Sequence, residues 1–268
     1  MLVILFTEFL ILFTLGVAIG TFGTLIGAGG GFLAVPLLII AYNFEPALAV
    51  GTSLVLVFFN SLSGSMAYLR QRRVDVRVGS IFTVLTIPGA IVGAFITSYF
   101  ESNIFNLLFV AILITSSIYM ILNPVQEMNI RRKSGSYKRT IKDFNGEVYE
   151  YSVHLPRGFL ISLLVGFISS IFGIGGGIIH VPAMIFLLGF PVHISTATSH
   201  FILAFSSFFG TATHFTLGNI NLEFAISMGI GALLGAQLGA IISKRTKATI
   251  IQRFLGIALI IVAIRMLI

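Results

Sequence analysis

The sequence contains no cysteine and no tryptophan, and only 9% of its 268 residues are charged. The absence of cysteine excludes disulfides, thiolate nucleophiles and cysteine-ligated metal or iron–sulfur sites. About a quarter of the residues of a typical soluble domain are charged, so this chain cannot cover a water-exposed surface with polar groups. With 57% hydrophobic residues and a mean hydropathy of +1.05, the composition indicates a protein surrounded by lipid.

The formal net charge of +7 comes from 16 Lys and Arg against 9 Asp and Glu. In a lipid-embedded chain this excess indicates basic loops that face the anionic cytoplasmic leaflet, so no nucleic-acid partner is expected. The seven tyrosines are expected to take the place of tryptophan at the membrane–water interfaces. The expected location is therefore the cell membrane, crossed several times.

Stretches without Asp, Glu, Lys or Arg predict the membrane-spanning helices, because a spanning helix needs about 20 mostly apolar residues. No Lys or Arg is expected in the core of any span. Single spans are predicted at 46–69, 78–100, 102–126, 193–215, 224–243 and about 247–268.

Two further apolar segments are interrupted by glycine runs at residues 27–31 and 173–177. Glycine has a low helix propensity and wide backbone freedom, so each run is expected to end a helix. About 11 apolar residues follow each run, and as a helix they reach only about 16 Å, half of a bilayer. Segments 2–42 and 157–189 are therefore predicted to be helical hairpins that enter the membrane and turn back.

Three basic segments, 70–77, 131–142 and 244–247, are expected in the cytoplasm by the positive-inside rule. All three reach the same side only if segment 157–189 starts and ends inside. The charge pattern thus supports the second hairpin independently of its glycines.

The two halves of the sequence align at a constant offset of 146 residues, which brings Pro36 onto Pro182 and Thr52-Ser53 onto Thr198-Ser199. The predicted fold is an all-α polytopic membrane protein of two inverted repeats, each a glycine-broken re-entrant helical hairpin plus three transmembrane helices. Inverted repeats with broken helices are typical of secondary transporters and also occur in some channels. The predicted domains are a first repeat at 1–126, a cytoplasmic polar linker at 127–156 and a second repeat at 157–268.

The linker is the only markedly polar segment. Asn145-Gly146 indicates a turn between two short strands at 138–144 and 147–153. Apart from this turn, the linker is expected to be a solvated tether without activity.

The glycine break before Pro36, its repetition before Pro182, and Thr196-Ala197-Thr198-Ser199 resemble the TauE/SafE family of sulfite exporters. The resemblance extends over essentially the whole chain. It implies a transporter that exports sulfur-containing anions such as sulfite, thiosulfate or organosulfonates, and it does not specify which anion.

An anion at membrane depth needs donors that replace its water, and no Lys or Arg is expected there. A helix that starts just after a glycine break presents free N–H groups and the positive end of its dipole, and hydroxyls of the next helix could complete the site. The predicted substrate-binding residues are Gly29, Gly30, Gly31, Thr52, Ser53, Gly175, Gly176, Gly177, Thr198, Ser199 and His200.

Each of these assignments has an alternative. Glycine runs can serve close helix packing alone, and Ser or Thr in a membrane helix often bonds its own backbone. Further polar candidates lie about two turns beyond the Thr-Ser pairs, at Asn60, Ser61, Ser206 and Ser207.

The histidines break the repeat, because His180 aligns with Ala34 and His200 aligns with Leu54. Both are expected at membrane depth, where a histidine could pair with the anion or carry a coupling proton. The alternative is a neutral ring that is hydrogen-bonded within the bundle. His193 and His214 are expected near loops, without a functional role.

Three other functions are alternatives to an anion transporter. A passive anion channel has the same sequence pattern. An intramembrane hydrolase could use Ser53 with His200, yet the Thr-Ser pair recurs and the histidine does not, which favours binding hydroxyls over a nucleophile. A metal transporter would need intramembrane Asp or Glu to bind a hard cation with His180 and His200, and the predicted spans contain neither. No enzymatic activity, cofactor or metal site is therefore expected, and the pattern is compatible with a homo-oligomer.

Overall fold

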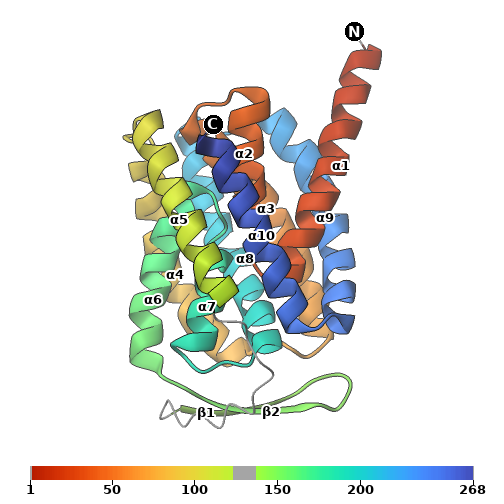
Figure 1. Ribbon diagram of the computed structural model, residues 1–268, viewed down its shortest axis with the longest axis vertical. Helices are drawn as coiled ribbons and strands as arrows, with labels where there is room; N and C mark the ends of the chain where they lie inside the picture. Colours follow the sequence, from red (N-terminus) through yellow and green to blue (C-terminus); the bar gives the residue numbers. More distant parts are fainter. Residues whose placement is uncertain (1, 123–136, 268) are drawn as a thin grey trace.

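The computed structural model describes residues 2–122 and 137–267 (Figure 1). These residues form ten helices and one two-stranded antiparallel sheet. In chain order the elements are α1 (Leu2–Ile26), α2 (Gly31–Tyr42), α3 (Pro46–Arg70), α4 (Val76–Thr97), α5 (Ser102–Leu122), β1 (Tyr137–Lys142), β2 (Val148–Val153), α6 (Leu155–Phe172), α7 (Gly177–Phe186), α8 (Val192–Thr216), α9 (Leu222–Arg245) and α10 (Ala248–Leu267).

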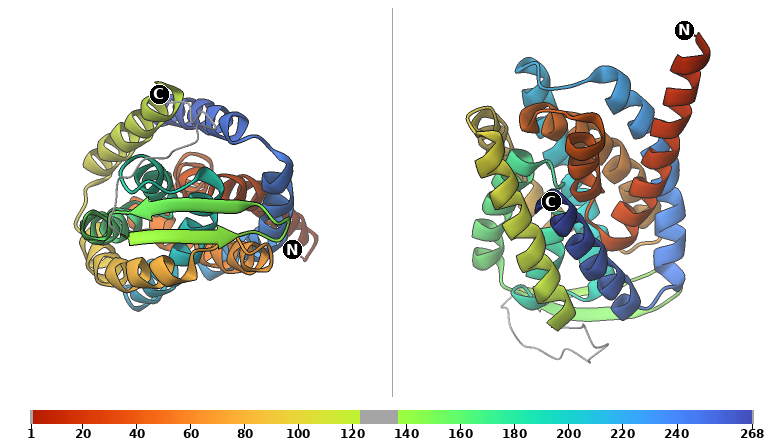
Figure 2. Two further views of the ribbon diagram at one scale, coloured as in Figure 1. Left: turned by 90° about the horizontal axis from the view of Figure 1, so that it is seen from below. Right: turned by 45° about the horizontal axis from the view of Figure 1, so that its top comes forward.

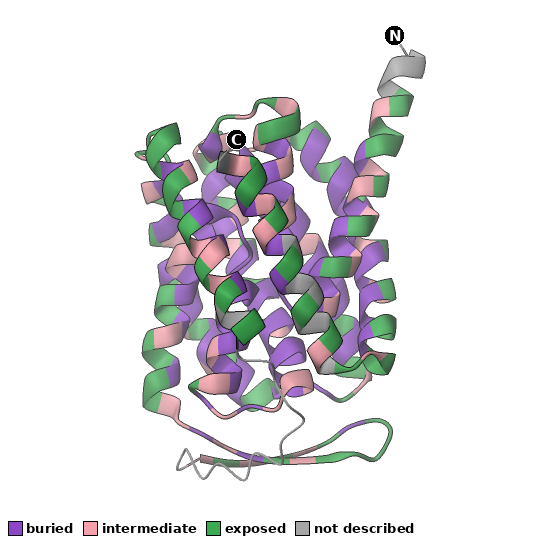
Figure 3. Cartoon of the chain, viewed as in Figure 1, coloured by how far each residue is buried: buried purple, intermediate pink, exposed green. Residues whose placement is uncertain are grey.

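The described helices include five that are long and apolar enough to cross a membrane. They are α1 from Phe6 onward, α3, α4, α6 and α9. Large apolar side chains such as Val84, Leu107 and Leu160 are 66%, 65% and 62% exposed, and exposed residues line the outer faces of the helices (Figure 3). A surface of this kind needs lipid to cover it. The protein is thus a multi-pass membrane protein.

Helix α8 is as long as α3 but is not among these five helices, and Ser, Thr and His make up much of its buried face. It lies near the centre of the bundle, where it packs against α3 and α4 (Figure 1). The polar residues of α8 therefore lie in the interior of the bundle, while Phe205, Phe208 and Phe215 are exposed on its outer face.

The two glycine runs end their helices as predicted. Helix α1 stops at Ile26, and the 12-residue helix α2 begins at Gly31; α6 stops at Phe172, and the 10-residue helix α7 begins at Gly177. These short helices are about 18 Å and 15 Å long, against about 30 Å for the hydrocarbon core. Helix α2 turns back toward the end at which α1 begins, and α7 turns back toward the start of α6 (Figure 1).

Helix pairing exchanges partners between the two halves of the chain. Helix α1 packs along α9, while its counterpart α6 packs along α4, and α5 packs against α10. Small residues allow close approach: a Cβ on Gly20 would lie 2.7 Å from the Ala232 Cα, and one on Gly166 would lie 2.1 Å from the Thr86 carbonyl oxygen. Each half of the chain therefore depends on the other for its packing.

The observed helix ends differ little from the predicted ones. Helix α6 begins at Leu155, two residues before the predicted start of the second repeat at 157. The predicted end of the 102–126 span and the basic residues Arg131, Arg132 and Lys133 lie outside the described residues.

Strands β1 and β2 confirm the predicted hairpin in the linker, with Tyr137 opposite Val153 and Lys142 opposite Val148. The turn between them contains Gly146 at φ +90°, a left-handed conformation that favours glycine. Asp143 Oδ1 stabilises the turn by accepting hydrogen bonds from the N–H groups of Asn145 and Glu147, both at 2.9 Å.

The expectation that the linker is a solvated tether is wrong for this hairpin. Tyr151 and Val153 are buried in an apolar cluster with residues of α4, α7 and α8, and the Tyr151 ring contacts that of Phe190 at 4.9 Å between centroids. The Arg139 guanidinium donates two 2.8 Å hydrogen bonds to the buried Asp75 carboxylate, and the Tyr151 hydroxyl donates a third at 2.6 Å. Burial and the neighbouring Asp75 charge raise the pKa of Tyr151 above its ordinary value, so the phenol keeps the proton that it donates.

The hairpin crosses one end of the bundle (Figure 2). Its turn meets the two other basic segments there. The Phe144 N–H donates to the Gln71 carbonyl at 3.0 Å, and Lys244 Nζ lies 5.8 Å from the centroid of the Phe144 ring. The prediction that the basic segments share one side is therefore confirmed for their described residues.

Removal of the Arg139 charge should destabilise the fold. We expect Arg139→Met to lower the free energy of unfolding by roughly 3 kcal/mol, because Asp75 then stays buried without its cation. Lys138→Met, at the exposed neighbouring position of the same strand, should change stability by less than about 0.5 kcal/mol. Thermal unfolding in detergent, followed by size-exclusion chromatography, compares the two variants. Equal melting temperatures would contradict a stabilising role for the ion pair.

Candidate functional site

The two glycine breaks lie directly against each other inside the bundle. A Cβ on Gly31 would lie 1.9 Å from the carbonyl oxygen of Gly173, and a Cβ on Gly177 would lie 2.0 Å from the carbonyl oxygen of Gly27. These two contacts are equivalent under the 146-residue offset. Only glycine permits such an approach of backbone to backbone at both places.

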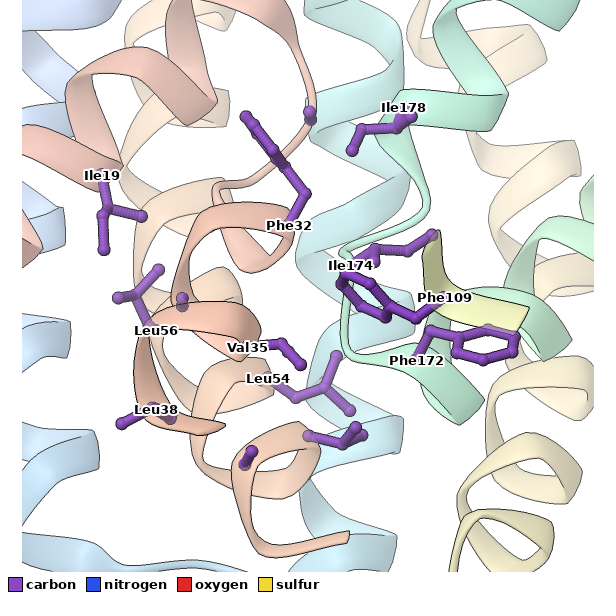
Figure 4. Close-up of a cluster of buried hydrophobic side chains, with 14 of the residues drawn as sticks. Ile19, Phe32, Val35, Leu38, Leu54, Leu56, Phe109, Phe172, Ile174 and Ile178 are labelled. Atoms are coloured by element: carbon purple, nitrogen blue, oxygen red, sulfur yellow. The ribbon is translucent and has the colours of Figure 1, made fainter. Parts of the chain in front are cut away.

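An apolar cluster covers one flank of this contact. Figure 4 shows Phe32 of α2 beside Ile174 and Ile178 of the second break, and all three side chains are fully buried. The cluster keeps polar backbone groups at the breaks away from lipid, and it strengthens their electrostatic interactions by lowering the local dielectric constant.

The start of α2 has free backbone donors. Its N-cap, Gly30, has φ +88° and makes no side-chain capping bond. Leu33 is the first residue of α2 whose N–H turns back to bond Gly30, at 3.0 Å, and no backbone carbonyl among the described residues accepts from the N–H groups of Gly30, Gly31 or Phe32. The start of α7 is partly satisfied, because the Gly177 N–H donates to the Gly175 carbonyl at 2.7 Å.

The predicted serines bind the opposite glycine break. The Ser53 hydroxyl lies 3.1 Å from the carbonyl oxygen of Gly173 and 2.8 Å from that of Val50, and the Ser199 hydroxyl donates to Gly27 at 3.2 Å. Each repeat thus supplies a hydroxyl to the break of the other repeat. Direct contact of Ser53 or Ser199 with a substrate stays a prediction.

The predicted threonines hold helix starts. Thr198 Oγ1 accepts the N–H of Asp75 at 3.0 Å, and Thr52 Oγ1 accepts the N–H of Asn221 at 3.0 Å. Asp75 and Asn221 are themselves the N-caps of α4 and α9, and each accepts the N–H three residues further on. These hydroxyls therefore have a structural role beside the breaks, and a role in binding also stays a prediction.

His200 lies in a fully buried chain of polar groups. Its Nε2 atom is 3.1 Å from the Thr24 hydroxyl oxygen, and that hydroxyl donates to Asn60 Oδ1 at 2.7 Å. Because the Thr24 hydrogen points to Asn60, the histidine donates its Nε2–H. Ser53 bonds carbonyl oxygens and does not form the serine–histidine pair that a hydrolase would need.

Asn60 presents a buried donor without a partner. It is fully buried, and its amide nitrogen has no hydrogen-bond partner among the described residues. An ideal Cβ on Gly23 would lie 2.8 Å from this nitrogen and 2.4 Å from the backbone nitrogen of Gly30. The unpaired amide is therefore beside the break at the start of α2.

His180 is also fully buried, and neither of its ring nitrogens has a partner in the described part of the chain. Its ring centroid is 6.2 Å from that of Phe82. The structure does not join His180 to the His200 chain by any hydrogen bond among the described residues.

Thr24 and His214 have structural roles that the sequence does not predict. The Tyr68 hydroxyl donates to the Thr24 carbonyl at 2.8 Å, and the aligned His214 Nε2 lies 3.2 Å from the Ser170 carbonyl. Tyr68 and His214 thus hold equivalent last turns before the two breaks. Their shared alignment position was the signal that marks them as a pair.

Among the described residues, no Lys or Arg contacts the glycines of the two breaks, yet basic side chains are present in one of the predicted spans. Arg253 and Arg265 lie within α10, where they are exposed, so the expectation of no Lys or Arg in any span is wrong for α10. In the described residues, no group of three or more His, Asp or Glu could hold a metal ion.

Residues 12–266 match the family described as "Sulfite exporter TauE/SafE". The chain belongs to this family. It is 36% identical over 246 residues to the "Probable membrane transporter protein YunE" of Bacillus subtilis, and the aligned residues cover 89% of this chain and 90% of the relative. It is 27% identical to "Probable membrane transporter protein ORF9" of Sinorhizobium sp (89% and 85% covered), and 24% identical to YfcA of Escherichia coli (82% and 76% covered). No solved structure matches the chain.

The contact between the breaks predicts that a single methyl group is damaging. Gly31→Ala should lower the free energy of unfolding by at least about 3 kcal/mol, because its Cβ would overlap the Gly173 carbonyl oxygen. Gly218→Ala is the matched control: Gly218 has φ +73° but nothing lies within 4 Å of its Cβ position, so only about 1 kcal/mol of backbone strain is expected. The folded yield in detergent and the melting temperature measure both. A Gly31→Ala protein as stable as Gly218→Ala would show that the two breaks can separate.

Proposed function

We propose that the protein is a secondary transporter that exports a small anion, a sulfur oxyanion or organosulfonate such as sulfite, by alternating access around a midplane site between its two broken helices. Membership of the sulfite exporter family supports the substrate class, and the relatives named as membrane transporter proteins support transport over catalysis. The protein acts in this proposal without a cofactor.

The observation that carries the proposal is the meeting of two glycine breaks whose adjoining backbone has unpaired N–H groups. An anion cannot leave water for the membrane interior unless donors replace its hydration shell. Helix α2 offers Gly30, Gly31 and Phe32 at its positive end, which carries about half an elementary charge. Glycines in the second break, Gly175 and Gly176 among them, supply the opposite wall.

The buried side chains add donors on one side of this site. Asn60 contributes an unpaired amide, and His200, held by Thr24, contributes an imidazole that can gain or lose a proton. We assign the role of coupling proton carrier to His200, with His180 as the other candidate. The repeat-equivalents of Asn60 and His200 are Ser206 and Leu54, so the anion is expected to lie closer to the first break.

The architecture in this proposal is a pair of inverted repeats, 1–126 and 157–268, joined by a cytoplasmic linker at 127–156 in the cell membrane. Two features support it: the broken hairpins turn back toward opposite ends (Figure 1), and helix pairs α1–α9 and α6–α4 exchange between the halves. In such an arrangement one repeat can rock against the other around a fixed site.

Uptake into proteoliposomes tests the function. Sulfite, thiosulfate, sulfate and a sulfonate are each offered with and without a pH gradient. A transporter gives saturable flux of at least one sulfur anion that responds to the gradient. Flux that rises linearly with concentration and ignores the gradient would instead indicate a passive channel, and absence of flux for all four anions would contradict the proposal.

Asn60→Asp tests whether the Asn60 amide donates a hydrogen bond to the anion. The aspartate still accepts the Thr24 hydroxyl but cannot donate to an anion, so we expect at least about tenfold weaker anion binding, in line with roughly 1.5–3 kcal/mol for a hydrogen bond to a charged group. Asn60→Leu should behave similarly without adding a charge. Ser206→Ala, at the equivalent position, should bind within about twofold of the unmodified protein. Calorimetry in detergent measures all three, and undiminished affinity in a folded Asn60→Leu protein would remove Asn60 from the site.

His200→Gln tests proton coupling. Glutamine keeps a donor for Thr24 but does not titrate, so the pH gradient should no longer drive uptake, while anion exchange at equal pH continues. His214→Gln is the control, because His214 bonds the Ser170 carbonyl and should leave the pH response intact. A pH response that persists in His200→Gln would assign coupling elsewhere, first to His180.

A further inference from the structure

The two ends of the bundle contain equivalent capping residues, but these residues have different partners. Asp75 and Asn221 occupy equivalent positions, each caps a helix, and each gives its N–H to an equivalent threonine. Asn221 is neutral, and the one sheet of the described residues lies at the other end of the bundle (Figure 1). Asp75 is charged, fully buried and covered by the β1–β2 hairpin. The hairpin is thus an addition to one end of an otherwise repeated design.

The hairpin grips Asp75 with charge-assisted hydrogen bonds. Arg139 binds both carboxylate oxygens at 2.8 Å, and Tyr151 binds Oδ2 at 2.6 Å. The Arg139 side chain is 19% exposed, so water can reach the guanidinium and replace its bonds if the hairpin lifts. Water can solvate the guanidinium and the carboxylate when they separate, so these hydrogen bonds can be exchanged for bonds to water and can re-form.

The hairpin also contacts elements of both halves of the chain. At its turn, Phe144 bonds the Gln71 carbonyl, Arg73 lies 3.8 Å from Asp143, and Lys244 of α9 lies over the Phe144 ring. At its other end, Tyr151 packs on Phe190 in the loop between α7 and α8. One strand pair therefore spans the α3–α4 loop, α9 and the entry to α8.

A short path leads from the hairpin to the glycine breaks. Arg139 holds Asp75, and the Asp75 N–H bonds Thr198 at 3.0 Å. The next residue, Ser199, donates to the carbonyl of Gly27 at 3.2 Å. Movement of Asp75 at the start of α4 would therefore shift Thr198 and Ser199, and through Ser199 the Gly27 carbonyl at the first glycine break.

We propose that the β1–β2 hairpin is a releasable latch that closes this end of the transporter, with Arg139 and Tyr151 holding Asp75 in the closed state. The latch must open in each transport cycle for the anion to reach or leave the site from this side. This inference rests on the proposed alternating-access function. It assigns a gating role to the β1–β2 hairpin and a positioning role to Arg139, Tyr151 and Asp75, without contact to the anion.

A reversible disulfide tests whether the latch moves. The protein has no native cysteine, so Gln71→Cys with Phe144→Cys introduces the only thiols. The 3.0 Å backbone hydrogen bond between these residues brings their Cα atoms within the range that a disulfide needs. The oxidised protein should bind the anion normally but transport at least about tenfold more slowly, and a reductant should restore the rate.

The matched control is Lys138→Cys with Ser152→Cys, which are opposite each other on the two strands. This disulfide joins the strands without fixing them to the bundle, so transport should be unchanged by oxidation. A rigid support would respond differently from a latch: locking Gln71 to Phe144 would then leave transport unaffected. That result would overturn the latch while leaving the proposed transport function intact.

A second readout does not depend on transport. Val153→Cys places a fully buried thiol under the hairpin, so a thiol reagent reaches it only when the hairpin lifts. In an Arg139→Gln background that elutes as folded protein, labelling should become at least about tenfold faster, because the grip on Asp75 is weakened. Equal labelling rates with and without Arg139 would overturn the latch. If the labelling rates differ as expected but the protein without substitutions transports none of the four anions, the transport proposal would be overturned instead.

Discussion

Two interrupted backbones at membrane depth create the constraint on which the rest of the structure depends. Lipid offers no hydrogen bonds, so non-helical backbone must be surrounded by protein or water. The structure meets this requirement by placing the breaks against each other, with Gly31 on the Gly173 carbonyl and Gly177 on the Gly27 carbonyl. Neither break could be buried in this way by its own half of the chain. Folding of one half is therefore coupled to that of the other.

The polar residues of α3 and α8 follow from this contact. Ser53 and Ser199 bond the carbonyls that the breaks leave open, while Thr52 and Thr198 accept the N–H groups of the residues that cap α9 and α4. The buried hydroxyls of the two central helices thus supply partners to the ends of four other helices. In the proposed transporter the same helices would transmit movement between the bundle ends and the anion site.

The glycine breaks and the helix positions were predictable because they depend on local composition, and the two halves of the sequence could be aligned because their offset is constant. Thr24, by contrast, has no pattern around it, and its importance arises only when Asn60 and His200 meet it from distant helices. The ion pair between Arg139 and Asp75 was also hidden. Both residues read as ordinary loop charges, and 64 positions separate them in the sequence. Contacts of this range carry no periodic signal, so a polar linker was read as a solvated one.

The departures from the 146-residue alignment are informative because other aligned positions make equivalent contacts, such as Gly31 on the Gly173 carbonyl and Gly177 on the Gly27 carbonyl. Two identical halves would give the two sides of a transporter identical properties. At aligned positions, however, Asn60 corresponds to Ser206, His200 to Leu54 and Asp75 to Asn221. The first two differences concentrate polar groups beside the first glycine break. The third adds a charged grip at one end of the bundle. Under the proposed mechanism, the polar groups favour one position for the anion, and the grip raises the free energy of opening one side. The free energy of opening each side would then depend on a few asymmetric side chains rather than on the fold, while the gradients of the anion and the coupling ion set the net direction of transport.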